Sequence, residues 1–160
     1  NLEFGETFTV PEPEIRDAVA VVPGLDGQKM SKSYHNTLEL FGTEKETRAR
    51  VMRVVTDSKG LADPKDPETC NVFKLYRLFA SPDQVAALAD RYRAGGMGYG
   101  DAKKALFEIL WEFLAPFRAR RQELERNPDY VEQVLRAGAE KARREARKTL
   151  DAARRAVGLT

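Results

Sequence analysis

The chain has 160 residues, of which 42% are hydrophobic and 32% charged, and its formal net charge is +2. This hydrophobic content excludes a disordered chain, and the length suffices for one domain with a core or for part of a larger protein. The charge is uneven, because residues 118–160 hold 12 lysines and arginines against 7 acidic residues, whereas residues 1–117 hold 15 against 18. The basic end is therefore suited to attract phosphate groups.

Two residue types occur only once, and this limits the possible chemistry. Cys70 is the only cysteine and His35 the only histidine, so no internal disulfide can form and a zinc site is not expected. We expect Cys70 to be a small buried side chain. We recognise no leader peptide and no apolar run of about 18 residues. These features favour a reducing, cytoplasmic setting and no membrane partner.

Extended structure is predicted for residues 1–23. The two prolines of "FTVPEPEI" oppose a helix, and the apolar run "AVAVV" (18–22) is typical of a strand buried on both faces. Because a lone strand is not stable, we expect its sheet partners to lie before residue 1 or on another chain. The chain also starts without a methionine, and we expect it to be a processed or truncated one.

Helices are predicted after a glycine-bracketed turn and a lysine-rich loop. Thr43 and Glu46 have the spacing of a capping box, which predicts a helix over 44–55. Asp66-Pro67 and Ser81-Pro82 are start signals for the next two helices, the second of which we expect over 82–93.

The second half of the chain predicts two longer helices. After the flexible stretch "GGMGYG" (95–100), we expect one helix from Asp101 towards Arg126, bent at Pro116. Asn127-Pro128 starts the other, which we expect to break near Gly138 and to end near Arg155. The fold class predicted from these patterns is mostly α, with one terminal strand and its loop followed by a helical bundle.

The stretch "GLDGQKMSKSYHN" (24–36) is the strongest candidate for chemistry. Lys29 and Lys32 are three residues apart on a bent loop, so both ammonium groups can converge on one polyphosphate. Ser31, Ser33 and the loop N–H groups add donors, while Met30 can anchor the loop on apolar surface. These groups suit the stabilisation of growing negative charge rather than proton abstraction. A KxxK pattern alone would indicate only a solvated loop.

A longer stretch than KxxK carries a family resemblance. "KMSKS", after "GLDG" and an expected strand, resembles the signature of the class I aminoacyl-tRNA synthetases. Further stretches are most similar to the tryptophanyl-tRNA synthetase family: "KMSKSYHNT", "VVTDS" (54–58), "NVFKLYRLF" (71–79), "GYGDAKKAL" (98–106), "AGAEKAR" (137–143) and "RRAVG" (154–158). The tyrosyl-tRNA synthetases share the loop but less often show "GYGDAKKAL" followed by "AGAEKAR".

The resemblance implies a domain organisation. Residues 1–41 would be the end of a Rossmann-like α/β nucleotide-binding catalytic domain with its KMSKS loop, and residues 42–160 the helical, anticodon-side tRNA-binding domain. The family's other ATP signature, HIGH, is absent from these 160 residues, and in this family it precedes the loop. The chain would therefore be the C-terminal half of an enzyme that is inactive without the other half.

The resemblance also implies an activity and its site residues. The reaction is the attack of the tryptophan carboxylate on the α-phosphorus of ATP, which enters with Mg²⁺ as substrate, followed by transfer of the aminoacyl group to tRNA(Trp). Lys29 and Lys32 would hold the β- and γ-phosphates, and the backbone around Val21 and Val22 would contact adenine. The whole implied ATP-binding set is Val21, Lys29, Met30, Ser31, Lys32 and Ser33. A homodimer through the missing N-terminal half is also implied, and no protein-bound metal.

Basic residues outside the loop are candidates for tRNA contacts. They lie at an expected helix start and near an expected helix end: Lys103, Lys104, Arg118, Arg120, Arg121 and Arg126. Cations are not favoured at a helix start, so a ligand-facing role is conceivable there, but an ordinary solvated helix face fits both groups as well. Two other functions stay open: a tyrosyl-tRNA synthetase-like enzyme, and a non-catalytic helical RNA-binding module that retains a KMSKS-like loop.

Overall fold

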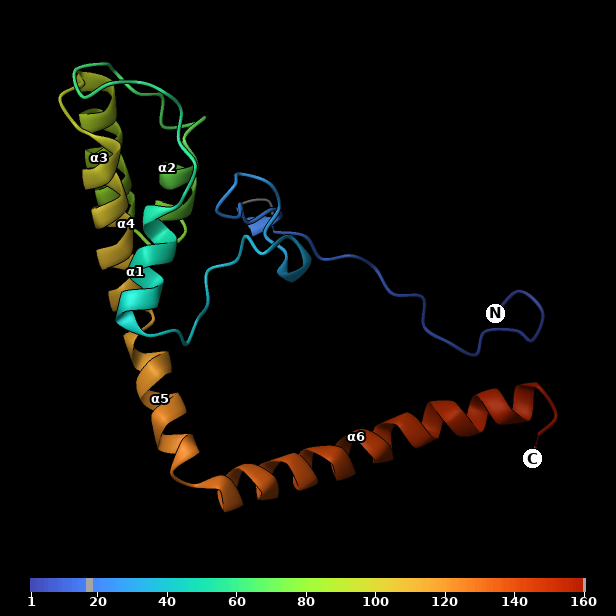
Figure 1. Ribbon diagram of the computed structural model, residues 1–160. Coiled ribbons are helices and arrows are strands. Elements are labelled where there is room, and N and C mark those ends of the chain that lie inside the picture. The colour runs from blue at the N-terminus through green and yellow to red at the C-terminus, as the bar shows by residue number, and fades with distance from the viewer. Residues whose placement is uncertain (17–18, 160) are drawn as a thin grey trace. The chain divides into compact units, whose positions relative to one another are not determined.

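The computed structural model describes residues 1–16 and 19–159. A short 3-10 helix, η2 (Lys32–Tyr34), and six α-helices form within these residues (Figure 1): α1 (Glu44–Met52), α2 (Asn71–Tyr76), α3 (Pro82–Ala94), α4 (Tyr99–Phe113), α5 (Ala115–Glu125) and α6 (Pro128–Ala156). The predicted mostly α fold class is confirmed. Contacts divide the chain into a helical unit, residues 16–119, and a second unit formed by residues 1–15 and 120–160. The domain boundary predicted near residue 41 stays a prediction.

The core of the helical unit lies around α4. This helix packs against both α1 and α2, and it buries Leu106, Phe107 and Leu110 at helical spacing. From α3, Tyr92 is fully buried, and its ring meets Phe73 edge to face with ring centres 5.5 Å apart. Cys70 is buried as predicted, with its sulfur 3.6 Å from the Tyr92 hydroxyl.

Local capping fixes most helix starts where the sequence predicts them. Thr43 and Glu46 form the predicted capping box of α1, in which the Thr43 Oγ1 accepts from the Glu46 N–H. Ser81 and Gln84 cap α3 in the same way, with Pro82 in the first turn. At α6 the Asn127 side chain accepts from the Tyr130 N–H. Such signals need only a few neighbouring residues, so they can be found without knowledge of the fold.

Three predicted helix boundaries are wrong. The helix expected after Asp66 begins only at Asn71, because the Asp66 carboxylate accepts from the Glu68 N–H and holds a turn instead. The long helix breaks at Leu114, just before Pro116, which can supply no N–H to continue the α4 hydrogen bonding. In α6, Gly138 lies in the middle of an unbroken helix.

No strand forms among the described residues. Ala18, the first residue of the strand predicted over 18–22, lies outside them, and residues 20–21 form a bend. One isolated antiparallel bridge joins Pro23 to Lys29. The physical reason is that a strand needs a run of backbone hydrogen bonds to a neighbour, whereas among the described residues this stretch makes one such bond to the loop, from the Met30 N–H to the Val22 carbonyl.

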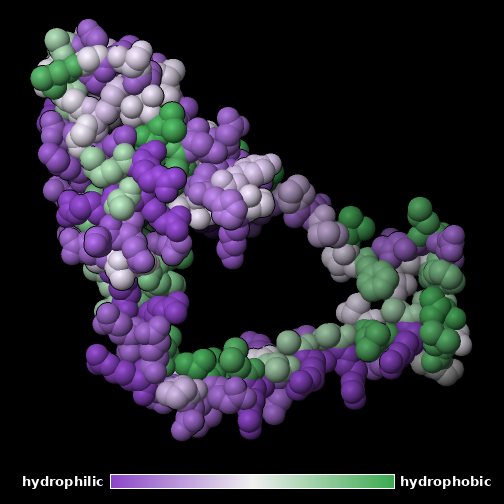
Figure 2. Space-filling model, viewed as in Figure 1, coloured by the Kyte–Doolittle hydropathy of each residue, from purple (hydrophilic) through white to green (hydrophobic). Residues whose placement is uncertain are grey.

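The second unit contains the long helix α6, which is strongly amphipathic. Figure 2 shows apolar side chains gathered along one side of α6 and charged ones along the other. Val134, Leu135 and Leu150 on this helix are each about half exposed or more. At the C-terminal turns of α6, Phe4 and Phe8 line an apolar pocket together with Ala153 and Val157. Neither α6 nor another described helix combines the length and apolar character needed to cross a bilayer.

Leu106 tests the core around α4. It is fully buried, so Leu106→Ala removes packed methyl groups and leaves a cavity, and the free energy of unfolding should fall by about 2–5 kcal/mol. Leu40→Ala is the matched control, because Leu40 is 59% exposed and its truncation should change stability little. Denaturant unfolding monitored by circular dichroism measures both. Equal effects of the two substitutions would contradict this core assignment.

Candidate functional site

The lysine loop is closed at its base by backbone hydrogen bonds. The Met30 N–H donates to the Val22 carbonyl at 2.9 Å, and the Gly24 N–H donates to the Gln28 carbonyl at 2.7 Å. Between them Gly27 takes a positive φ of 84°, which glycine adopts without strain. The predicted turn at "GLDG" is therefore a tight, internally bonded hairpin-like turn that brings Val22 beside Met30.

Leu25 joins this turn to the helical unit. Its side chain is 7% exposed and belongs to the same core as Val51 and Val54. Its N–H donates to the Asn36 carbonyl at 2.9 Å, and its carbonyl accepts from the Val55 N–H at 2.7 Å. The turn is thus bonded both to the end of the loop and to the residues that follow α1.

The side chain of Asn36 forms hydrogen bonds to three residues of the loop, and the sequence analysis did not identify it as a site residue. Its side-chain Nδ2 donates to the Asp26 Oδ1 at 2.8 Å and to the Lys29 carbonyl at 3.2 Å. Its Oδ1 accepts from the Ser31 N–H at 2.7 Å. The hydrogen bond from Asn36 stabilises the Asp26 carboxylate and lowers its pKa below the ordinary value.

The two lysines of the loop are exposed. Neither Lys29 nor Lys32 forms an ion pair with a described residue. Ser31 and Ser33 lie on either side of Lys32, and their hydroxyl oxygens are 2.8 Å apart in a mutual hydrogen bond. Met30 is half-buried and packs against the core, as predicted for the anchor of the loop. The loop therefore offers two free ammonium groups and a pair of hydroxyls to solvent.

His35 ends the 3-10 helix η2 in the left-handed region, with φ 53°. Its N–H donates to the Lys32 carbonyl at 3.2 Å. This reversal turns the chain so that the Asn36 side chain contacts the backbone of Lys29 and Ser31. Val21, a predicted adenine contact, is 62% exposed, and Val22 lies next to Met30 through the hydrogen bond described above.

Comparison with known proteins identifies the family. The sequence matches the family described as "tRNA synthetases class I (W and Y)" over residues 2–115, which is more than half of the chain. The chain belongs to this family.

The relatives share high identity with this class I synthetase chain. It is 53% identical over 156 residues to a protein of Rhodopirellula baltica and 46% identical over 160 residues to one of Fusobacterium nucleatum, both named tryptophan–tRNA ligase. A crystal structure of tryptophanyl-tRNA synthetase from Campylobacter jejuni, complexed with ADP and tryptophan, superposes with a TM-score of 0.83 at 42% identity. The alignments cover 98–99% of this chain. The chain spans about half the length of these relatives.

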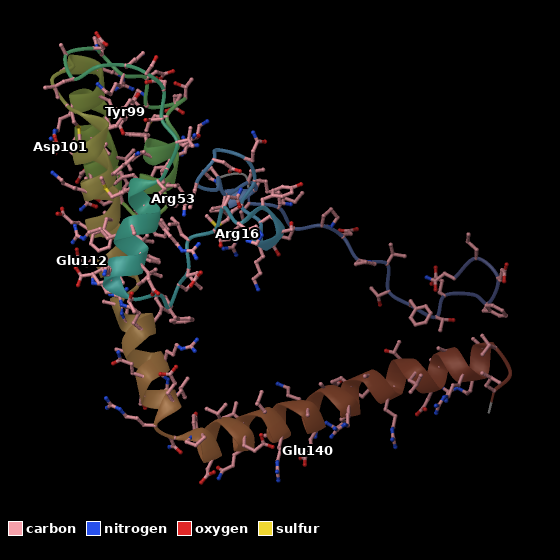
Figure 3. The ribbon with its side chains drawn as sticks, viewed as in Figure 1. Arg16, Arg53, Tyr99, Asp101, Glu112 and Glu140 are labelled. Atoms are coloured by element: carbon pink, nitrogen blue, oxygen red, sulfur yellow. The ribbon has the colours of Figure 1, made fainter. Side chains whose placement is uncertain are left out.

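A second polar cluster lies at the start of α4, in the helical unit. Tyr99 (Figure 3) donates from its hydroxyl to the Asp57 Oδ1 at 2.7 Å, and the same oxygen accepts from the Lys59 N–H. Lys65 is 3% exposed; its Nζ donates to the Gly60 and Asp63 carbonyls and lies 5.2 Å from the centre of the Tyr99 ring. Asp57, Tyr99 and Lys65 therefore hold the 57–65 loop on the core.

The two lysines predicted at a helix start lie on α4 with partners in the chain. Lys103 donates from Nζ to the Met52 carbonyl at 3.0 Å, and its partial burial lowers its pKa. Lys104 pairs with Asp101 at 3.2 Å, and both side chains are more than half exposed. Lys103 thus closes the end of α1, whereas Lys104 stays accessible to solvent.

The arginines predicted near a helix end differ in how they are held. Arg118 stacks on Trp111 with its guanidinium carbon 3.5 Å from the ring centre, and its Nη2 donates to the Trp111 carbonyl at 2.7 Å. Arg120 pairs with Glu123 and Arg121 with Glu125, in each case with half-exposed side chains. Arg126 forms no ion pair with a described residue. The tRNA-binding role of these residues stays a prediction.

Five residues predicted from the ATP signature, 29–33, share one short loop. The structure brings Asn36, which the sequence analysis did not identify, into contact with this loop. The described residues contain no group of three or more His, Cys, Asp and Glu side chains that could hold a metal ion.

The Asp57–Tyr99 hydrogen bond makes a prediction about acid stability. The bond lowers the pKa of Asp57, chiefly through the Tyr99 hydroxyl. A carboxyl whose pKa is depressed by folding adds stability above its unfolded value, near 3.8, and that contribution disappears as the pH falls through the folded value. Tyr99→Phe should raise the Asp57 pKa towards the ordinary value and weaken the acid dependence of unfolding. An NMR titration of the Asp57 carboxyl measures the shift. Tyr34→Phe, which alters an exposed tyrosine, should leave the Asp57 pKa unchanged.

Proposed function

We propose that this chain is the C-terminal half of a tryptophan–tRNA ligase, an ATP-dependent and AMP-forming enzyme. The observation that carries the proposal is the lysine loop: Lys29 and Lys32 are exposed on an internally bonded loop in a chain about 50% identical to proteins named tryptophan–tRNA ligase. A surface made only for binding would have no need of two unpaired lysines on so ordered a turn.

In the proposed reaction, a carboxylate oxygen of tryptophan attacks the α-phosphorus of ATP. A new oxygen–phosphorus bond forms, the bond from the α-phosphorus to the bridging oxygen breaks, and pyrophosphate leaves with the electron pair. ATP enters with Mg²⁺ as substrate. No proton must be removed, because the attacking carboxylate is already ionised at neutral pH. In the second step, the 2′-hydroxyl oxygen of the terminal adenosine of tRNA(Trp) attacks the carbonyl carbon of the adenylate. An ester bond forms, the bond from that carbon to the phosphate oxygen breaks, and AMP leaves with the electron pair while the hydroxyl proton passes to AMP or solvent.

The residues of the lysine loop have separate roles in this proposal. Lys29 and Lys32 bind the β- and γ-phosphates and neutralise the charge that grows on pyrophosphate. Ser31 and Ser33 offer hydroxyl donors, Met30 anchors the loop on the core, and the backbone at Val21 contacts adenine. The Campylobacter jejuni relative, whose structure contains ADP and tryptophan, supports a nucleotide site in this fold.

The organisation of the whole enzyme follows from the same proposal. Residues 1–41 close the nucleotide-binding domain, residues 42–160 form the tRNA-binding side, and the upstream half carries the HIGH element, the tryptophan pocket and a homodimer interface. Two findings support a missing half: the chain spans about half the length of its relatives, and the apolar side of α6 is largely exposed. We place the enzyme in the cytoplasm.

The alternatives are less well supported. A tyrosine substrate fits the family description equally well, but the relatives described above are named for tryptophan. A non-catalytic RNA-binding module is separated from the enzyme by the first experiment below.

Lys32 tests the catalytic role of the loop in the complete enzyme. Lys32→Ala should lower tryptophan-dependent ATP–pyrophosphate exchange by about two orders of magnitude, because it removes one preorganised charge from the developing pyrophosphate. Tryptophan binding should not change. Lys45→Ala on α1 is the matched control, since it removes the same charge from an exposed helix position. Exchange at the wild-type rate in Lys32→Ala would remove Lys32 from the mechanism, whereas no exchange by the complete wild-type protein would favour the RNA-binding module.

Substitution of the arginines on α5 and of Arg126, just after it, tests the proposed tRNA binding. The ion pairs of Arg120 and Arg121 are exposed and therefore weak, so a phosphate can replace the carboxylate. Changing Arg120, Arg121 and Arg126 to glutamine should weaken tRNA binding. The salt dependence of binding should become shallower by about one unit for each phosphate that the variant no longer neutralises. Pyrophosphate exchange should be unaffected.

The control for this experiment removes equal charge from α6, at Arg136, Arg143 and Arg147. Arg118 is left unchanged, because its packing on Trp111 would confuse folding with binding. An equal decrease of tRNA affinity in the two triple variants would show that general charge, not this helix, binds the tRNA.

A further inference from the structure

Asn36 combines burial with an unusually complete set of side-chain hydrogen bonds. It is 3% exposed, and among the described residues only Thr47 and Lys65 are polar or charged and equally buried. Both N–H groups of its amide are used, towards Asp26 and the Lys29 carbonyl, and its oxygen accepts from the Ser31 N–H. All three partners belong to the lysine loop, so these bonds order the loop itself.

The positions of these bonds in the chain determine what they order. The Lys29 carbonyl belongs to the peptide group before Met30, and the Ser31 N–H belongs to the peptide group after it. One side chain therefore fixes two successive peptide groups between Lys29 and Lys32. These peptide planes set the directions of the Cα–Cβ bonds beside them. Asn36 therefore holds the backbone of Lys29, Met30 and Ser31, and Lys32 follows directly after this fixed segment.

Gly24 provides the space that Asn36 occupies. A Cβ atom built on Gly24 would lie 2.3 Å from the Asn36 Nδ2 and 2.4 Å from its Cγ, far closer than atoms can approach. The backbone of Gly24 is itself bonded to Gln28 across the turn and cannot simply move away. The turn and the asparagine therefore fit together only when residue 24 has no side chain.

We propose that Asn36 is a positioning residue for the reaction, which holds the backbone between Lys29 and Lys32 in the form that directs both ammonium groups to one polyphosphate. The inference rests on the proposed function of the loop. Asn36 does not reach the substrate, since its side-chain bonds are all internal. It acts by preorganisation: without it the two flexible lysines must be ordered at the moment of reaction.

The decisive substitution is Asn36→Asp, studied in the complete enzyme. The new side chain has the same size but lacks both donors, and its carboxylate would face the Asp26 carboxylate across the present 2.8 Å bond. We expect kcat for pyrophosphate exchange to fall by about 10- to 100-fold, with the KM for tryptophan unchanged. A general disruption of the structure would instead raise the KM for tryptophan, and it would also lower the melting temperature of the enzyme.

A double substitution provides the rescue. In Asp26→Asn/Asn36→Asp the amide and the carboxylate exchange places, so an N–H···O bond between positions 26 and 36 can form again. Part of kcat should return, while Asp26→Asn alone should stay near wild type because its side-chain oxygen can still accept from Asn36. Gly24→Ala is an independent variant, which displaces Asn36 without altering its chemistry and should lower kcat in the same way.

The outcomes separate this inference from the function on which it rests. If Lys32→Ala lowers exchange but Asn36→Asp and Gly24→Ala keep the wild-type kcat, the positioning role is overturned and the proposed function stands. If the KM for tryptophan rises along with the fall in kcat, or the swap restores nothing, the positioning role is also overturned. If Lys32→Ala has no effect on exchange, the role proposed for the lysine loop falls together with that of Asn36, and if the complete wild-type protein shows no exchange, the proposed function falls.

Discussion

The two backbone hydrogen bonds of Leu25 are the constraint on which the lysine loop depends. Its N–H donates to the Asn36 carbonyl and its carbonyl accepts from the Val55 N–H, while its side chain is buried with Val51 and Val54. The loop therefore takes its place from the end of α1, which is in turn packed on α4. Whatever anchors α4 also anchors the loop, although Lys29 and Lys32 themselves stay exposed.

Helix ends could be predicted from the sequence where neighbouring residues cap them. They could not be predicted where the same side chain can form either a helix cap or a turn. Thr43 and Ser81 cap α1 and α3 through residues three positions away, so the pattern is legible in a short stretch. At Asp66 the same kind of side chain accepts from the Glu68 N–H and makes a turn. A start signal and a turn signal are chemically alike. Here Asp66 holds a turn, and the helix begins at Asn71, where Val72 and Phe73 are buried.

The candidate site shows the same division between local and distant information. The KMSKS signature is a contiguous pattern, and it points directly to Lys29, Lys32 and their neighbours. Asn36 carries no such mark, because its partners Asp26 and Lys29 lie ten and seven residues earlier. They come together only after His35 adopts φ 53° and the chain reverses. The two glycines of the turn can be recognised in the sequence. The clash that makes glycine necessary at position 24 depends on where Asn36 lies in the structure.

The sequence alone does not show which charged side chains are available to a ligand. The arginines of α5 look alike in the sequence, yet Arg118 is held on Trp111, with its Nη1 buried and without a hydrogen-bond partner among the described residues. Arg120 and Arg121 have carboxylate partners at helical spacing. An exposed ion pair contributes little, so an RNA phosphate can displace the carboxylate, whereas moving Arg118 would cost its stacking and its bond to the Trp111 carbonyl. Arg118 therefore joins α5 to α4 as a structural element, and the tRNA contact proposed for this region would fall to the arginines whose present carboxylate partners are easily exchanged.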